Sequence, residues 1–286
     1  MTENYLRLPY TLIKIDGPDA ARFLQGQVSC DVEALEENSW SYGTANTPKG
    51  RMYWLFVIAR IDGAFWIRVH NEIADSGIQV LSKYKVFFKC EIVKQNDFAV
   101  YGLTDSCDGK SKKIELDSLG FKRAADISGR RSELWSSSAL EPLSSEEELA
   151  LWLKEDVNQG IPELYPETLD TFILQHLNLQ DLGAVSFKKG CYTGQEIIAR
   201  MKFLGKLKKK MYHFVLNNEA TFSVLPGSNI LNSEGKKIGQ LVRAHLSDGV
   251  LSGLLVCDMT FVEHSEPAFL EGYPTQPLKI TELHYN

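Results

Sequence analysis

The chain has 286 residues, 44% of them hydrophobic and 24% charged, a balance typical of a globular protein with a buried core and not of a disordered one. Its net charge of -6 argues against general attraction to nucleic acid, because that attraction depends on lysine and arginine displacing counterions from phosphates. We see neither a signal or transit peptide nor an apolar run long enough to cross a bilayer, and we therefore expect a cytoplasmic protein with no membrane association.

The opening residues predict a strand over 12–15 followed by a turn at Asp16-Gly17. Asp16 is a suitable N-cap for the helix that follows, in which Phe23 and Leu24 face inward.

Residues 53–69 predict a β-hairpin, because two β-prone runs are separated by Asp62-Gly63, a pair suited to a type I′ turn. We expect Asn71 to cap a following helix. The inward face of that helix would carry Ile73, Ile78, Leu81 and Tyr84. Strands are predicted again over 86–93 and 98–103, and the short spacing favours an antiparallel α+β domain over a Rossmann fold.

Loops with short strands are expected over 104–145. Ser145 and Glu148 form a capping-box pattern that opens a helix ending at Gly160, and a second helix is predicted over 169–177. After Lys210 the chain has short β runs broken by glycine turns, which suggest a small closed barrel. A domain boundary is therefore predicted near Gly205.

The five cysteines are odd in number, scattered and never in a C-x-x-C pair, which argues against a disulfide framework, a zinc site or a resident iron–sulfur cluster. They are Cys30, Cys90, Cys107, Cys191 and Cys257. The six histidines show no zinc-binding spacing either, so no metal site is expected.

Residues 189–200 read KGCYTGQEIIAR, in which Thr193 and Glu196 form a capping-box pattern that predicts a helix from Gly194. Cys191 would then stand ahead of a helix N-terminus and beside Lys189, a position that lowers a thiol pKa. Spacing alone favours a structural interpretation, with Cys191 as a small buried residue, Tyr192 in the core and the glycines as turn residues.

This segment matches the signature of the YgfZ family at every position, and the resemblance extends over most of the chain. Similar blocks stand at 17–32, 47–56, 160–164, 176–190 and 227–244, whereas 70–140 is weakly covered. We refer to residues 189–200 as the signature segment.

The resemblance implies a GcvT-like, three-domain cloverleaf that it shares with the glycine-cleavage aminomethyltransferase. It implies domains at 1–45 plus 145–204, at 46–144 with a ferredoxin-like fold, and at 205–286 as a C-terminal β-barrel. It also implies tetrahydrofolate in a central channel and a role in assembling or repairing iron–sulfur clusters of client proteins, including radical enzymes that modify tRNA.

On this basis Cys191 is the candidate catalytic residue. The candidate folate-binding residues are Lys189, Gly190, Tyr192, Gly194, Gln195, Glu196 and Arg200. Lys189, Arg200 and the lysines of 202–210 are candidates for the glutamate tail, and Tyr192, Trp54 or Trp152 for walls of the pterin slot.

Two alternatives remain open from the sequence. One is a folate-dependent one-carbon transferase, for which Asp31 is a candidate carboxylate, although the Arg-x-Gly-Tyr-Thr-Gly-Glu motif of the aminomethyltransferase is absent. The other is an RNA-binding module, which would need aromatic residues interleaved with the lysines of 205–212. An accessory protein with iron–sulfur clients as partners is the preferred hypothesis.

Overall fold

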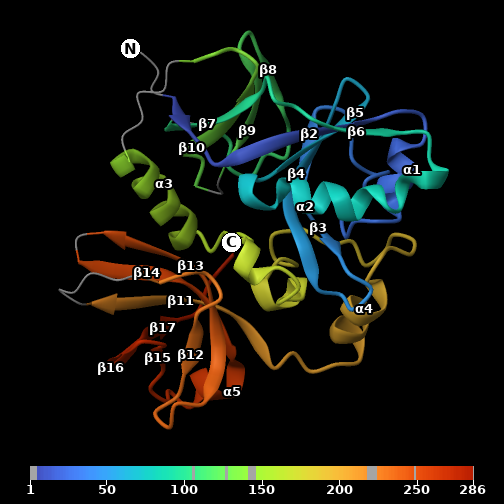
Figure 1. Ribbon diagram of the computed structural model, residues 1–286. Helices are drawn as coiled ribbons and strands as arrows, with labels where there is room; N and C mark the ends of the chain where they lie inside the picture. The colour runs from blue at the N-terminus through green and yellow to red at the C-terminus, as the bar shows by residue number, and fades with distance from the viewer. Residues whose placement is uncertain are drawn as a thin grey trace.

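The computed structural model describes residues 5–104, 107–125, 128–140, 146–217, 224–247 and 249–285. Within these ranges the strands form three antiparallel sheets of five, five and seven strands, with short helices against them (Figure 1). This mixed architecture agrees with the antiparallel α+β class predicted from the sequence. In the described ranges we find no helix with the length and apolar character needed to span a membrane.

The first sheet has the strand order β3-β4-β5-β2-β6. Its strands are β2 (Tyr10–Asp16), β3 (Ser39–Asn46), β4 (Met52–Ile61), β5 (Ala64–His70) and β6 (Glu91–Lys94). The predicted hairpin is β4–β5, and its turn residues Asp62 and Gly63 have φ angles of +51° and +75°. Strands β3 and β4 pair as far as Asn46 and Met52, so this sheet runs across the boundary predicted between residues 45 and 46.

Helix α1 (Ala20–Gln25) follows β2 and buries Phe23 and Leu24, as predicted. The predicted cap is wrong, because the N-cap residue is Asp19. The Asp16 carboxylate instead accepts a hydrogen bond from the Gly17 backbone N–H and pairs with Lys14 on its own strand. Gly17, with φ of +124°, turns the chain before the helix begins.

Helix α2 (Asn71–Ser82) covers the first sheet and buries Ile73 and Leu81. Its N-cap is His70 and not Asn71, whose side chain accepts a hydrogen bond from the Thr11 hydroxyl. Tyr84 lies beyond the helix and is exposed.

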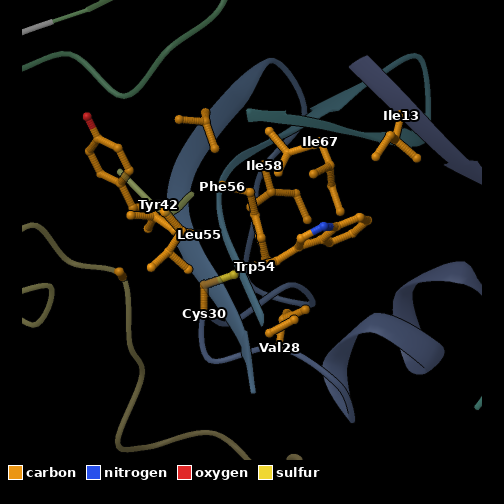
Figure 2. Close-up of a cluster of buried hydrophobic side chains, with 14 of the residues drawn as sticks. Ile13, Val28, Cys30, Tyr42, Trp54, Leu55, Phe56, Ile58 and Ile67 are labelled. Atoms are coloured by element: carbon orange, nitrogen blue, oxygen red, sulfur yellow. The ribbon is translucent and has the colours of Figure 1, made fainter. Parts of the chain in front are cut away.

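Trp54 belongs to the core of the first sheet. Its indole N–H donates to the Ile73 carbonyl oxygen at 2.9 Å, and a Cβ at Gly77 would lie 1.7 Å from the same nitrogen. Figure 2 shows the ring among buried side chains that include Ile58 and Ile67. Trp54 therefore serves packing, and its prediction as a wall of a ligand slot is wrong.

The second sheet has the order β1-β7-β10-β9-β8. Its strands are β1 (Leu6–Arg7), β7 (Ala99–Thr104), β8 (Glu115–Asp117), β9 (Gly120–Ala124) and β10 (Arg131–Ser136). The ferredoxin-like description of this part of the chain remains a prediction.

The third sheet has the order β16-β15-β12-β13-β14-β11-β17 and its own buried cluster of apolar side chains. Its strands are β11 (Lys209–Asn217), β12 (Asn229–Leu231), β13 (Lys237–Ser247), β14 (Val250–Asp258), β15 (Phe269–Leu270), β16 (Tyr273–Pro277) and β17 (Lys279–Thr281). The sheet curls into a half-barrel, with β16 and β17 as its edges, and is not the closed barrel predicted. Helix α5 (Met259–Glu263) follows β14.

Helix α3 (Glu146–Asn158) buries Trp152 and Val157 and is followed by Gly160, whose φ of +66° ends it as predicted. The predicted capping box falls on Ser145, which lies outside the described residues.

Two predicted elements are wrong. Residues 169–177 form no α-helix: the 3₁₀ turns η2 (Pro166–Thr168) and η3 (Leu174–Leu177) flank a turn at 169–171 and the single residue Ile173 that bridges Arg51. Of residues 86–93 only the last three belong to β6, because η1 (Lys85–Phe87) comes first and exposes Val86 and Phe87.

Buried charges connect the sheets where they meet. Glu133 on β10 pairs with Arg123 on β9 at 2.6 Å and with Arg68 on β5 of the first sheet at 2.8 Å. Burial alone would raise the pKa of Glu133, but the two guanidinium groups outweigh it and lower the pKa to about 2.

A second carboxylate extends this connection to the third sheet. Asp156 on α3 lies 3.0 Å from Arg131 on β10 and 3.5 Å from Arg243 on β13. All three side chains are buried, so the charges are shielded from water and salt. Ion pairs thus link all three sheets through α3 and β10.

Candidate functional site

The signature segment is a loop that leads into helix α4 (Gln195–Phe203). Gly194 is the N-cap residue, with φ of +85°, and no side chain caps the helix. The predicted capping box does not form, because the Thr193 hydroxyl contacts the Gln27 side chain and Glu196 lies 3.9 Å from Arg200. The helix starts as predicted, but the left-handed glycine and not the threonine makes its first turn.

The loop at residues 47–51 packs directly on this helix start. A Cβ at Gly194 would lie 2.7 Å from the Thr47 carbonyl oxygen, and one at Gly50 would lie 2.9 Å from Cβ of Ile197. Arg51 donates a hydrogen bond to the Thr171 carbonyl oxygen. The loop at 47–51, itself bonded to Thr171, therefore holds the helix start in place, and close backbone approach requires both glycines.

Lys189 points inward. Its ammonium group donates to the carbonyl oxygens of Val28 at 2.8 Å and Cys30 at 2.7 Å, and it lies 5.1 Å from the Tyr192 ring centroid. Burial lowers the pKa of Lys189 to about 8, partly offset by Cys30 and Asp31. In this structure the ammonium group fastens the signature segment to the Val28–Cys30 turn, and a contact of Lys189 with a folate tail stays a prediction.

Tyr192 is buried under the same loop. The residue is 6% exposed, and its hydroxyl has no hydrogen-bond partner among the described residues. Burial raises the pKa of Tyr192 well above its usual value. The residue anchors the loop from below, so it offers no face to a ligand from solvent.

Cys191, between these two buried anchors, is exposed. Cys30, Cys90 and Cys257 are buried and Cys107 is half-buried. Burial raises the pKa of Cys30 to about 12 and that of Cys257 to about 11, and it also raises the pKa of Cys90. The geometry thus presents the Cys191 thiol to a partner while its neighbours hold the backbone.

The remaining candidates of the signature segment lie at the surface or near it. Gly190 is exposed and meets no neighbouring atom within 4 Å of an added Cβ. Gln195 is partly buried, with its backbone N–H bonded to the Tyr192 carbonyl oxygen. Glu196 and Arg200 form an exposed pair along α4.

A separate cavity of about 320 Å³ opens between β3, the end of β9 and the loops at 159–161 and 181–183. Trp40 and Tyr42 form one wall as an edge-to-face pair with centroids 5.5 Å apart, and Ile161 and Leu182 also line it. None of the predicted site residues is among those lining this cavity. Such a volume with aromatic walls suits a flat organic ring.

The polar side chains that line the cavity include Lys110, Lys112, Gln159 and Asp181. The Lys112 ammonium lies 3.7 Å from the Trp40 ring centroid, where burial and, secondarily, Arg123 lower its pKa to about 8. The Trp40 indole N–H is buried without a hydrogen-bond partner among the described residues. A buried donor left unpaired is costly, and the indole nitrogen is closed off from the cavity space.

The cavity wall is supported by a distant part of the chain. The Tyr285 hydroxyl donates to the Gly160 carbonyl oxygen at 3.0 Å, and Gly160 stands between two lining residues, Gln159 and Ile161. In Figure 1 the C-terminus lies beside the end of α3.

Sequence reasoning missed this wall. The aromatic pair Trp40 and Tyr42, two positions apart on one strand, was a usable signal, because residues i and i+2 share a face. Nothing in the sequence placed Lys112 over them. The predicted wall residue Trp152 is buried beneath Arg131 and packs at Gly102.

Asp31, the candidate carboxylate of a transferase, has a structural role. Its Oδ1 accepts hydrogen bonds from the Gln25 side chain at 2.9 Å and from the Ala34 backbone N–H at 3.3 Å. These bonds close the turn after α1, so the carboxylate is already used as a cap.

Known proteins resemble this chain in sequence over most of its length. An uncharacterized protein of Haemophilus influenzae is 32% identical over 247 residues, which cover 85% of this chain and 84% of that protein. The tRNA-modifying protein YgfZ of Cronobacter sakazakii is 30% identical over 283 residues, covering 87% of this chain and 85% of the relative. Its namesake in Aliivibrio fischeri is 28% identical, covering 86% and 82%. No family model matches the chain.

Among solved structures, the glycine cleavage system aminomethyltransferase T of Bartonella henselae matches with a TM-score of 0.66. The match covers 98% of this chain and 84% of that one, at 12% sequence identity. Identity at this level indicates a shared fold and leaves the chemistry to be argued from the site.

Proposed function

The chain belongs to the YgfZ family, and from this premise we propose that it is a tetrahydrofolate-binding accessory protein that supports assembly or repair of iron–sulfur clusters in client enzymes. The clients we propose include radical enzymes that modify tRNA, in keeping with the name tRNA-modifying protein carried by its relatives. The observation that carries the proposal is the exposed Cys191, held between two buried anchors of the signature segment.

Cys191 acts in this proposal as a transient ligand for the client's cluster. Its thiol loses a proton to solvent, and the thiolate sulfur donates an electron pair to one iron in place of an exchangeable ligand, with no change of oxidation state. A cluster needs about four protein ligands, so the client supplies the others. The anchoring of Lys189 and Tyr192 keeps the sulfur in place during this exchange.

Tetrahydrofolate fits the aromatic cavity better than it fits the signature segment. The edge-to-face wall of Trp40 and Tyr42 can face a pterin, and Lys110 and Lys112 can meet carboxylates. When bound, the folate supplies a reduced ring that carries one-carbon units. The residues of this chain hold and orient it there.

The thiol role is tested in cells that lack the native protein. Complementation with Cys191→Ser should leave the fold intact and lower the activity of iron–sulfur clients, measured as the level of modified tRNA. Cys107→Ser, at a half-buried thiol, is the matched control and should complement fully. Full complementation by Cys191→Ser would make the cysteine structural and end the accessory-factor mechanism.

The folate role is tested by calorimetry with tetrahydrofolate. Trp40→Ala removes one ring of the aromatic wall and should weaken binding roughly two- to tenfold, the value of an aromatic contact. Polyglutamylated folate should bind more tightly than the monoglutamate at low salt, and added salt should erode the difference. An absence of heat and of any thermal shift with the wild-type protein would remove the folate claim.

A further inference from the structure

The far end of α4 exposes apolar side chains beside the signature segment. Phe203 is 66% exposed and Leu204 is 85% exposed, and the Phe203 ring meets Phe187 edge-on at 5.9 Å. We call Phe187, Phe203 and Leu204 the α4 patch. Single exposed apolar residues are common, but a cluster of them beside a candidate site is typical of an interaction surface.

The α4 patch lies within reach of Cys191. Phe187 precedes Cys191 by four residues, and four residues of extended chain span at most about 14 Å. A standard protein–protein interface covers about 800 Å² on each partner, a disc of about 16 Å radius. One partner can therefore cover the patch and the thiol together.

Cations surround the patch. Lys188, Lys202, Lys206 and Lys208 are exposed, and Lys202 lies over the Phe187 ring at 5.5 Å. Between residues 187 and 208 the sequence has one acid, Glu196, and it faces Arg200. None of these four lysines forms an ion pair within the part of the chain that the structure describes. An apolar centre with a basic rim is complementary to an apolar pocket edged by carboxylates.

We propose that the α4 patch is the docking surface for the client protein, which presents an apolar pocket edged by aspartate and glutamate next to its cluster. The inference rests on the proposed function, since it places that client over Cys191. A protein is favoured over tRNA because Leu204, the most exposed residue of the α4 patch, is aliphatic and suits an apolar protein pocket. The net charge of -6 also opposes a polyphosphate partner.

The test measures binding of a purified radical-type tRNA-modifying enzyme that carries its [4Fe–4S] cluster, with the full chain at two salt concentrations. The double variant Leu204→Ser/Lys206→Glu should bind at least about tenfold more weakly, because it removes an apolar anchor and reverses a rim charge. Salt should weaken wild-type binding more than that of the variant. Phe87→Ser, at an 89% exposed phenylalanine in η1, is the matched control and should bind like the wild type.

Equal binding by the double variant, or an equal loss in Phe87→Ser, would overturn the docking surface. So would a double variant that loses binding to tRNA alone while it keeps the enzyme, which would make the patch an RNA contact. Failure of the proposed function has a different signature: Cys191→Ser would support clients fully while the double variant still lost binding. In the reverse pattern, the double variant docks normally and Cys191→Ser impairs the clients. That result would support the thiol role and overturn the docking surface.

Discussion

Solvent access distinguishes the cysteines more clearly than their sequence positions do. Cys191 is exposed, whereas burial raises the pKa of Cys30 to about 12, which lowers its thiolate fraction at neutral pH about a thousandfold relative to an ordinary thiol. We expect iodoacetamide at pH 7.5 to modify Cys191 first, by at least about tenfold over any other site. Peptide mapping after short exposure measures this, with the denatured protein as the control in which all five react. Earlier labelling of any other cysteine would contradict it.

In the proposed folate site, Lys112 sets the sign of the pH dependence of binding. Its pKa of about 8 means that the ammonium is charged at pH 7 and largely neutral at pH 9, so attraction for carboxylates is present below pH 8 and lost above it. Tetrahydrofolate affinity should fall by up to about tenfold between pH 7 and pH 9.

The matched variant for this prediction is Lys112→Arg, because a guanidinium stays charged throughout that range. Calorimetry at pH 7, 8 and 9 should show a flat profile for the variant. The same decline in both proteins would show that another group titrates, and would remove Lys112 from the site.

At the scale of elements, the start of α4 depends on one glycine. Gly194 has a left-handed backbone and would push a Cβ to 2.7 Å from the Thr47 carbonyl oxygen. Gly194→Ala should therefore lower the free energy of unfolding by at least about 1–2 kcal/mol from the backbone conformation alone, with the collision added.

Gly190→Ala is the control, four residues away in the same loop and with open space around its added Cβ. It should change stability by less than about 0.5 kcal/mol, as surface substitutions usually do. Urea denaturation measures the free energy of unfolding of both variants. Equal stabilities would mean that the loop at 47–51 moves aside and does not hold the helix.

Local sequence patterns predicted those helices and strands whose conformation depends mainly on their own residues. The β4–β5 hairpin was predictable because Asp62 and Gly63 favour positive φ, and helix α3 because its apolar spacing and Gly160 mark its face and end. The helix predicted over 169–177 does not form because tertiary contacts override local preference there. Ile173 bridges Arg51, and the Met52 backbone N–H donates to the Phe172 carbonyl oxygen.

The candidate site also has a part that the sequence predicts and a part that only the fold reveals. The signature segment was visible in the sequence, since its glycines and cysteine stand together within a few residues. The inward turn of Lys189 was not, because its acceptors at Val28 and Cys30 are about 160 residues away in the chain. The cavity was missed for the same reason, because Trp40 and Lys112 meet only in the folded chain.

At the scale of the whole molecule, Glu133 is central to acid stability. Its folded pKa of about 2 lies below the unfolded value of 4.5, so its contribution is complete above pH 4.5 and is lost as pH falls toward 2. That contribution is on the order of 3 kcal/mol. Glu133→Gln should therefore be less stable at pH 7 and should show a shallower loss between pH 4.5 and 2.

Unfolding followed by tryptophan fluorescence across that pH range measures the effect. Glu36→Gln removes an exposed carboxylate that pairs with Lys113 and should alter the acid curve far less. If both variants gave the same curve, the buried pairs between the sheets would carry no special share of acid stability.

The support of Gly160 by Tyr285 also sets an order in time during protein synthesis. The two residues are 125 positions apart, so a ribosome adding about 5–20 residues each second makes the tyrosine roughly 6–25 s after the glycine. During that interval α3 and the loop after it exist without the hydroxyl that braces them. The nascent chain therefore braces this wall of the aromatic cavity only after the loop that carries Cys191 has been made.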